Sequence, residues 1–406
     1  MQTSNVLVGI VGKPNSGKTT FFNAATASNA KVADYPFTTI EPNVGMAFAT
    51  LECVCKEFSV KDNPRNSLCI DGIRHAPIRM IDVAGLVPDA WRGRGLGNKF
   101  LDDLRQADVL IHVVDASGAH DADGRPLGKP GMWDPLKDVQ FLEEEIARWM
   151  FQIIKRDWDR LARIVENERR DLIEVLSERL SGLSIREEHI KRALEVVDAD
   201  PERPRRWSDD LLYSFVKELR KVSKPIIIVA NKIDIPKAEE NYERMREAGI
   251  DAIPTSALAE YALITYAERG VIKYIRGSNH FEILQPNKLS ERERKLFKKI
   301  EELLDKWGST GVQKAINKAV FDILKMIAVF PVEDVNRLSD KKGNVLPDVI
   351  LVPYGTTARE FAGYIHTDLA KTFLYAIDVR TKKKLGEDYV LKHRDVIKIV
   401  AAGARG

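Results

Sequence analysis

Near the start of the chain, two glycines, two lysines and two threonines follow an apolar run. Residues 12–19 read GKPNSGKT and match the pattern G-x-x-x-x-G-K-[ST], between the strand-like run VLVGIV and a helix-like pattern. Glycines allow backbone N–H groups to approach phosphate oxygens closely, and a helix N-terminus favours the same anions. Lys18 can place a positive charge on the β- and γ-phosphates, and the Thr19 hydroxyl can ligate Mg²⁺. We therefore expect a nucleoside phosphate to contact the residues of this loop, namely Gly12, Lys13, Pro14, Asn15, Ser16, Gly17, Lys18, Thr19 and Thr20.

Later stretches concern the metal and the base. The sequence DVAG (82–85) ends a strand-like run, so Asp82 can hold Mg²⁺ through water and the Gly85 N–H can meet the γ-phosphate. The sequence NKID (231–234) follows another such run. A carboxylate at Asp234 can accept two hydrogen bonds from guanine N1–H and N2–H₂, a donor pair that adenine lacks. These residues favour GTP, with contacts expected from Asn231, Lys232 and Asp234.

Two further stretches complete the set of motifs. The sequence TSAL places Ser256, Ala257 and Leu258 after the next strand-like run, where a backbone N–H can bond guanine O6. The sequence YPFTTIEPNVG (35–45) lies between the phosphate loop and DVAG, where a mobile loop can bring a threonine hydroxyl to Mg²⁺. Each motif alone is weak, but their order along the chain, each at a strand end, indicates a GTP-binding domain.

The elements that must position these residues form a doubly wound α/β domain. Continuously apolar runs at 6–11, 78–85, 109–115, 225–232 and 252–257, separated by helix-like patterns, are typical of buried parallel strands. The amphipathic stretch from residue 136 predicts a long helix that ends near SGLS (181–184). Ser290 and Glu293 form a predicted capping box. We predict a G domain of residues 1–119 and 223–281, a helical insertion (120–222), a helical connector (282–330) and a compact α+β domain (331–406).

Charge and composition limit the possible environments. The chain carries 63 basic and 60 acidic residues, so a nucleic-acid footprint would have to be local. Neither a membrane-spanning run nor a signal peptide is recognisable, and we expect a cytoplasmic protein. Three cysteines, Cys53, Cys55 and Cys69, read as reduced cytosolic thiols, and no histidine or further cysteine completes a zinc-site spacing.

The motifs resemble those of Obg-type GTPases, specifically the YchF-like branch. YPFTTIEPNVG and GLVPDAWRGRGLGNKFLDDLRQAD (85–108) match the two switch regions of that family, and the similarity spans nearly the whole chain. The resemblance implies that Thr39 is the switch threonine on Mg²⁺, that residues 331–406 form a TGS domain of β-grasp fold, and that the protein associates with ribosomes or translation. Many YchF-like proteins carry a glutamate-type fourth motif and prefer ATP. The NKID of this chain favours GTP, with an ATPase as the alternative.

The machinery for hydrolysis departs from the common pattern. Leu86 occupies the place where Ras-like enzymes carry a water-orienting glutamine, so we expect slow turnover unless a partner, a monovalent cation or a loop side chain compensates. In related GTPases an asparagine at the position of Asn15 helps to hold K⁺, although Asn15 could equally shape only the loop. His120 lies where related proteins carry a histidine proposed to act on water, or it is a solvent-exposed loop residue. The expected catalytic residues are Lys18, Thr39, Gly85 and His120, and the expected Mg²⁺ ligands are Thr19, Thr39 and Asp82.

Two interpretations of the protein's function remain open. The chain is either an enzyme with turnover or a nucleotide-gated module, in which hydrolysis resets a switch that docks RNA or the ribosome. The basic stretches RTKKKLG (380–386) and LKHRDVIK (391–398) could contact phosphates, or could be solvated turns.

Overall fold

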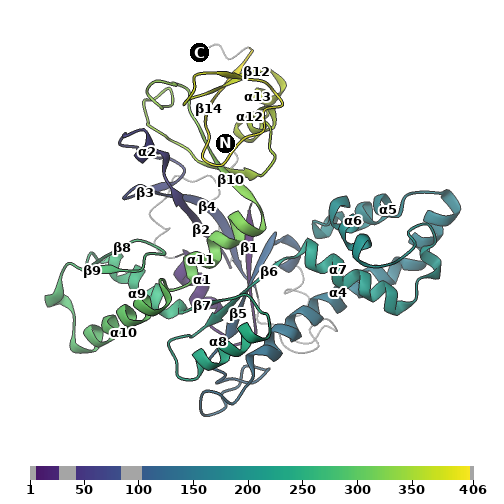
Figure 1. Cartoon of the computed structure of the whole chain (residues 1–406), viewed down its shortest axis with the longest axis horizontal. Helices are drawn as coiled ribbons and strands as arrows, with labels where there is room; N and C mark the ends of the chain where they lie inside the picture. Colours follow the sequence, from purple (N-terminus) through teal and green to yellow (C-terminus); the bar gives the residue numbers. More distant parts are fainter. Residues whose placement is uncertain (1–5, 27–42, 84–102, 403–406) are drawn as a thin grey trace.

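A seven-stranded sheet forms the centre of the molecule (Figure 1). The structure is a computed structural model and describes residues 6–26, 43–83 and 103–402. Parallel strands pair in the order β4-β1-β5-β6-β7. Their bounds are β1 (Leu7–Val11), β4 (Ile73–Asp82), β5 (Val109–Asp115), β6 (Ile226–Asn231) and β7 (Ala252–Thr255). Both β1 and β5 are buried along their whole length, as the apolar runs predict, and the doubly wound, mostly parallel fold is confirmed.

One edge of this sheet was not predicted. Strand β2 (Val44–Glu52) runs antiparallel to β4, and β3 (Leu68–Ile70) pairs with the start of β4, with the short helix α2 (Val54–Glu57) between them. Strand β4 therefore begins at Ile73, earlier than the apolar run at 78 suggested, because its first half pairs with β2 and β3 rather than with β1.

Helices cover both faces of the sheet. On one face, α1 (Lys18–Thr26) and α11 (Val312–Asn317) pack Phe21 and Ile316 into the same core as Val8 and Ile111. On the other face, α4 (Pro135–Glu168) and α7 (Asp209–Ser223) pack against Leu7 and Leu110. The remaining elements of the domain and its connector are as follows: α1 (Lys18–Thr26), α8 (Ala238–Glu247), α9 (Ala257–Glu268), β8 (Ile272–Tyr274), β9 (Phe281–Ile283), a 3-10 turn (Pro286–Lys288), α10 (Glu291–Trp307), α11 (Val312–Asn317) and a π-helical turn (Lys318–Ile323). The predicted capping box of Ser290 and Glu293 is present at the start of α10.

An arm of helices leaves the sheet between β5 and β6 (Figure 1). Its helices are α4 (Pro135–Glu168), α5 (Leu172–Leu180), α6 (Glu187–Val196) and α7 (Asp209–Ser223), with 3-10 turns at Ser181–Leu183 and Pro204–Arg206. The prediction of one helix up to SGLS is wrong. Arg169 adopts a left-handed conformation with φ 54°, and Asp171 caps a new helix with a bond from the Ile173 amide.

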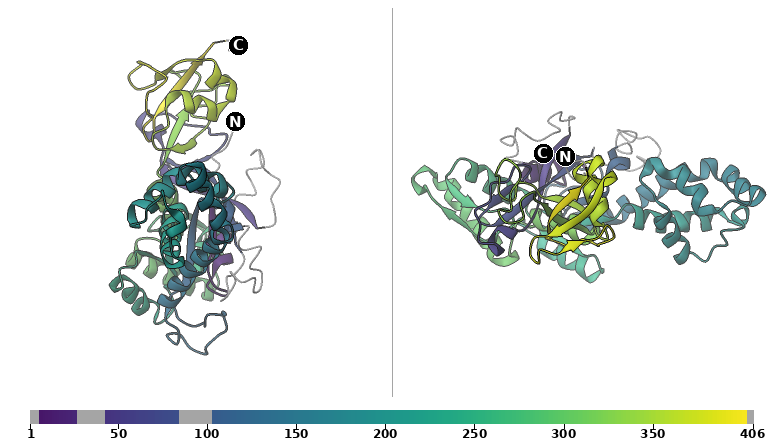
Figure 2. Two further views of the ribbon diagram at one scale, coloured as in Figure 1. Left: turned by 90° about the vertical axis from the view of Figure 1, so that its right-hand side faces the viewer. Right: turned by 90° about the horizontal axis from the view of Figure 1, so that it is seen from above.

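The C-terminal domain is a five-stranded sheet in the order β11-β10-β14-β12-β13, with two helices against it (Figure 2). Its elements are β10 (Met326–Pro331), β11 (Ile350–Pro353), α12 (Ala358–Ile365), α13 (Thr367–Lys371), β12 (Phe373–Asp378), β13 (Lys384–Leu385) and β14 (Val396–Ala401). Phe361 and Leu391 lie in its separate core. Among the described residues, no helix is long and apolar enough to cross a membrane.

Candidate nucleotide-binding site

The loop between β1 and α1 requires both of its glycines. Gly12 has φ 149°, and a Cβ atom there would lie 2.5 Å from the Val113 carbonyl oxygen of the neighbouring strand. Gly17 has φ 97°, and a Cβ atom there would lie 2.3 Å from Nδ2 of Asn231. Neither position accepts a side chain, so the loop can wrap closely around a phosphate.

Lys18 lies across this loop. Its Nζ atom donates to the Lys13 carbonyl at 2.8 Å, and the side chain is almost fully buried. Burial lowers the pKa of Lys18 to about 8, against the opposing attraction of the Asp82 carboxylate. A bound phosphate would give this ammonium a negatively charged partner in place of the water that burial excludes.

Thr19 and Asp82 meet at the end of the sheet. The Thr19 hydroxyl donates to Oδ2 of Asp82 at 2.9 Å. Burial raises the pKa of Asp82, although the bond from Thr19 and the charge of Lys18 act in the opposite direction. The other oxygen, Oδ1, is buried and has no hydrogen-bond partner among the described residues. A hydroxyl beside a carboxylate with an unused oxygen is the hard-oxygen donor set that Mg²⁺ takes, so the residues present fit this ion.

The side-chain amide of Asn231 connects three segments. Nδ2 donates to the Ser16 carbonyl at 2.9 Å, and Oδ1 accepts from the Ala257 amide at 3.1 Å. The end of β6 is thereby fixed both to the phosphate loop and to the start of α9. Asp234, three residues later, is exposed to solvent.

Lys232 and His120 share a buried carboxylate at the end of β5. Nζ of Lys232 lies 2.9 Å from Oδ2 of Asp115 and donates to the Asn15 carbonyl at 2.7 Å. Nδ1 of His120 lies 2.7 Å from the same Oδ2. Burial favours the protonated acid, but hydrogen bonds from Ser117 and the Lys232 ammonium outweigh it and hold the pKa of Asp115 below its ordinary value.

The segment 118–128 lies over the phosphate loop. Asn15, with φ 61°, donates from Nδ2 to the Gly124 carbonyl at 2.9 Å, and Lys13 donates to the His120 carbonyl at 2.8 Å. A Cβ atom on Gly124 would lie 2.6 Å from the Pro14 carbonyl oxygen, so the two segments are in direct contact.

Helix α4 also reaches this loop. Lys13 forms a buried ion pair with Asp138 at 2.8 Å, and Trp133 donates to the same carboxylate. Lys13 also lies 5.0 Å from the centre of the Trp133 ring. The first turn of the helical arm is therefore part of the site.

The structure brings together most of the residues that the motifs single out, but not all of them. Thr39, Gly85 and Leu86 lie outside the described residues. His120 contacts Asp115 and Lys13, rather than the Thr19–Asp82 pair. The segment 256–258 begins α9, and its Ser256 amide already donates to the Thr310 carbonyl.

Three further residues of the site, Asp115, Gly124 and Asp138, lie outside the sequence motifs. Asp115 could have been predicted from the sequence, because it is a carboxylate at the C-terminal end of a buried strand. Gly124 and Asp138 could not have been predicted, since their contacts join segments more than a hundred residues apart.

Comparisons with known proteins cover the same regions. A model described as the G4 motif-containing domain of YGR210-like Obg-like GTPases matches residues 229–334, one described as 50S ribosome-binding GTPase matches 7–154, and a TGS-domain model matches 341–401. An uncharacterized GTP-binding protein of Methanocaldococcus jannaschii is 53% identical over 398 residues, covering 98% of this chain and 99% of the relative. The chain belongs to the Obg-like, YchF-type family of GTP-binding proteins with a TGS domain.

Other members of this family extend the comparison. A GTP-binding protein of Pyrococcus horikoshii has a solved structure with a TM-score of 0.77 and 39% identity, covering 98% of this chain and 100% of that one. The ribosome-binding ATPase YchF of Bacillus subtilis is 28% identical, covering 96% of this chain and 97% of its own. The YchF GTPase of Schizosaccharomyces pombe, at 22% identity and a TM-score of 0.59, shares the fold over 98% of this chain and 100% of its own. The resemblance found in the motifs is confirmed.

Proposed function

We propose that this protein binds GTP with Mg²⁺, hydrolyses it slowly to GDP and phosphate, and acts as a nucleotide-dependent switch on the ribosome. The observation that carries the proposal is the double hydrogen bond of Asn231, which holds the NKID segment against the phosphate loop. A base bound beside this segment meets the exposed carboxylate of Asp234, which suits the N1–H and N2–H₂ donors of guanine.

The start of α9 supports the same base. The Ser256 and Ala257 amides donate to Thr310 and Asn231, while the Leu258 amide has no partner among the described residues. Leu258 is therefore the proposed donor to guanine O6, in place of the two residues before it.

An ATPase is the second candidate, because relatives that cover nearly the whole chain are named ribosome-binding ATPases. Competition between GTP and ATP for the purified chain separates the two. We expect a preference for GTP of more than about 100-fold, lost in Asp234→Ala and reduced in Asp234→Glu, since the unpaired donors of guanine would then be buried. Equal affinities in the parent protein would defeat the guanine assignment.

For hydrolysis, Thr19 and Asp82 would hold Mg²⁺ together with Thr39. When bound, the ion neutralises phosphate charge. Lys18 meets the β- and γ-phosphates, and the Gly85 amide is the proposed donor to the γ-phosphate.

His120 is proposed to orient the attacking water, which Leu86 cannot do. Asp115 holds the His120 ring in place through Nδ1. His120→Gln should lower kcat by about 10²-fold with unchanged GTP affinity, and an unchanged kcat would remove His120 from the reaction.

K⁺ beside Asn15 is a further part of this proposal. Nδ2 of Asn15 is committed to Gly124, which leaves the side-chain oxygen as a ligand that could stabilise transition-state charge through the cation. We expect K⁺ to accelerate hydrolysis over Na⁺, and Asn15→Ala to abolish the difference. Asn15→Gly should abolish the difference as well, because it removes the same side-chain oxygen while glycine tolerates the left-handed backbone without strain. Equal rates in Na⁺ and K⁺ would overturn this role.

The ribosome link is supported by the names of the relatives and by the TGS-domain match. The proposed contacts with RNA phosphates are made by residues 380–386 and 391–398 and by the helical arm. Co-sedimentation with ribosomes, with GDP or a non-hydrolysable GTP analogue and at rising salt, tests both parts. A lack of nucleotide dependence would exclude a switch.

A further inference from the structure

All three cysteines of the chain meet at one point, away from the nucleotide site. They lie where β2 ends, in the short α2 and in β3, at the sheet edge that was not predicted. Sγ of Cys55 lies 3.8 Å from Sγ of Cys69, and Sγ of Cys53 lies 3.3 Å from Oδ2 of Asp62. The ligand atoms of these four residues all lie within 4.8 Å of one another.

Clustered thiols can bind a metal ion or form a disulfide, and these two outcomes differ in the distance between the sulfur atoms. Four ligands at zinc–sulfur and zinc–oxygen bond lengths of about 2.3 and 2.0 Å form a tetrahedron whose S···S and S···O edges are about 3.8 and 3.5 Å. A disulfide brings two sulfurs to about 2.05 Å. The Cys55–Cys69 and Cys53–Asp62 spacings are close to these edges, and no two of the four ligand atoms are more than 4.8 Å apart.

The surroundings also suit an anionic metal site. Cys53 and Cys55 are buried, and the Cys55 amide points at Sγ of Cys53 at 3.5 Å. Arg74, which is fully buried, places Nη2 at 3.2 Å from Oδ2 of Asp62. Its guanidinium also donates to Ser67 and to the Leu346 carbonyl. Such a cation supplies the charge compensation and ligand orientation that outer-shell groups give to metal sites.

We propose that Cys53, Cys55, Cys69 and Asp62 form a closed, structural site for one zinc ion. Asp62 is the fourth ligand, which the spacing of cysteines and histidines in the sequence did not reveal. Three thiolates and a carboxylate leave no position for a substrate, so the ion stabilises structure rather than taking part in a reaction.

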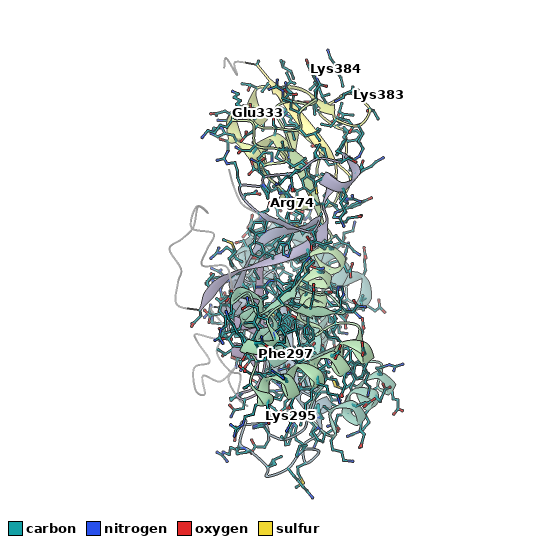
Figure 3. The ribbon with its side chains drawn as sticks, turned by 90° about the vertical axis from the view of Figure 1, so that its left-hand side faces the viewer. Arg74, Lys295, Phe297, Glu333, Lys383 and Lys384 are labelled. Atoms are coloured by element: carbon teal, nitrogen blue, oxygen red, sulfur yellow. The ribbon has the colours of Figure 1, made fainter. Side chains whose placement is uncertain are left out.

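The site lies next to the C-terminal domain, at the narrow junction where Figure 3 labels Arg74. The loop that carries Asp62 lies along residues 345–349. The Asn63 amide donates to the Val345 carbonyl at 3.1 Å, and the Val349 amide donates to Oδ1 of Asn66 at 3.0 Å. A metal that holds Asp62 to the three cysteines therefore fixes the loop 62–66, which bonds to residues 345–349 of the TGS domain.

The first test is metal content of the full chain, purified without chelator and under anaerobic conditions. We expect one zinc per chain by elemental analysis. After exchange for Co²⁺, we expect the intense visible bands of tetrahedral cobalt and a near-ultraviolet thiolate charge-transfer band. A chain that binds no zinc, a spectrum of octahedral cobalt, or a Cys55–Cys69 disulfide in the anaerobic protein would each overturn the site.

Variants separate ligands from neighbours. Cys69→Ser and Asp62→Asn should each weaken zinc binding by more than about 100-fold, beyond the effect of losing an outer-shell group. Asp71→Asn is the matched control, since Asp71 is a nearby carboxylate paired with Lys273 outside the cluster. Equal losses in the control would overturn the ligand assignment.

Hydrogen exchange tests the docking role. Zinc removal should speed amide exchange in 345–349 by at least about tenfold and leave exchange in β5 unchanged. Only the contact between 345–349 and the loop 62–66 would open locally. Unchanged exchange there would show that the metal does not hold the domain.

Discussion

Gly17 and Asn231 fit together so closely that the space for one methyl group is missing: a Cβ atom on the glycine would lie 2.3 Å from Nδ2 of the asparagine. The phosphate loop and the NKID segment, over two hundred residues apart, are therefore built as one unit.

Gly17→Ala should uncouple these two segments. The added methyl group must displace the Asn231 amide, so we expect nucleotide affinity to fall by at least about 100-fold, measured with a fluorescent GTP analogue. Gly270→Ala is the control, because Gly270 has a similarly positive φ of 67° but nothing within 4 Å of the added atom. It should cost only backbone strain, about 1 kcal/mol, and leave affinity unchanged. Equal effects of the two changes would contradict the packing explanation.

Asp82→Asn should remove the response to Mg²⁺. In the parent protein we expect chelation by EDTA to weaken GTP binding by about tenfold or more, because the phosphate charge is no longer neutralised. In the variant, affinity with and without the metal should be the same. The exposed Asp305→Asn should behave as the parent. A Mg²⁺ response that survives in Asp82→Asn would place the ion elsewhere.

Asp138→Ala should destabilise the protein although it lies in the helical arm. The change leaves the Lys13 ammonium buried without its carboxylate, at an expected cost of about 3–5 kcal/mol in the free energy of unfolding. Adding Lys13→Met should recover much of this loss. For comparison, Glu144→Ala breaks an exposed pair with Arg148 on the same helix and should cost about 0.5 kcal/mol. An additive double variant would indicate that the pair is not coupled.

His75 makes the protein sensitive to acid. Burial lowers its pKa from 6.5 to about 4, so between these values the unfolded chain binds a proton that the folded chain does not. Stability contributed by neutral His75 is therefore present above pH 6.5 and lost as the pH falls towards 4, by up to about 3 kcal/mol.

Denaturant unfolding from pH 7 to 4 measures this effect. His75→Gln should have a shallower pH dependence than the parent, whereas the exposed His366→Gln should keep the full slope. Some slope should remain in His75→Gln, because burial also lowers the pKa of His112, to about 3. Identical slopes in all three proteins would contradict the assignment.

Local signals were sufficient for the parallel strands and the phosphate loop. Buried parallel strands read as continuous apolar runs, and their C-terminal ends bring Asp82 and Asn231 to the edge of the sheet where the first turn of α1 carries Thr19. The turn at Arg169 was missed, because an amphipathic pattern continues through a change of helix direction. The contacts of Gly124 and Asp62 could not be predicted, since each depends on chain segments that carry no shared periodicity.

Helix α4 has a mechanical consequence. Its first turn is bonded to the phosphate loop through Asp138, and its 34 residues span about 50 Å at 1.5 Å per residue. A tilt of about 10° at the nucleotide end would move the far end by about 9 Å over that length. An arm of this length would magnify any tilt of α4 that a displacement of the phosphate loop produced, and such a tilt could be measured as a distance change at the tip of the arm.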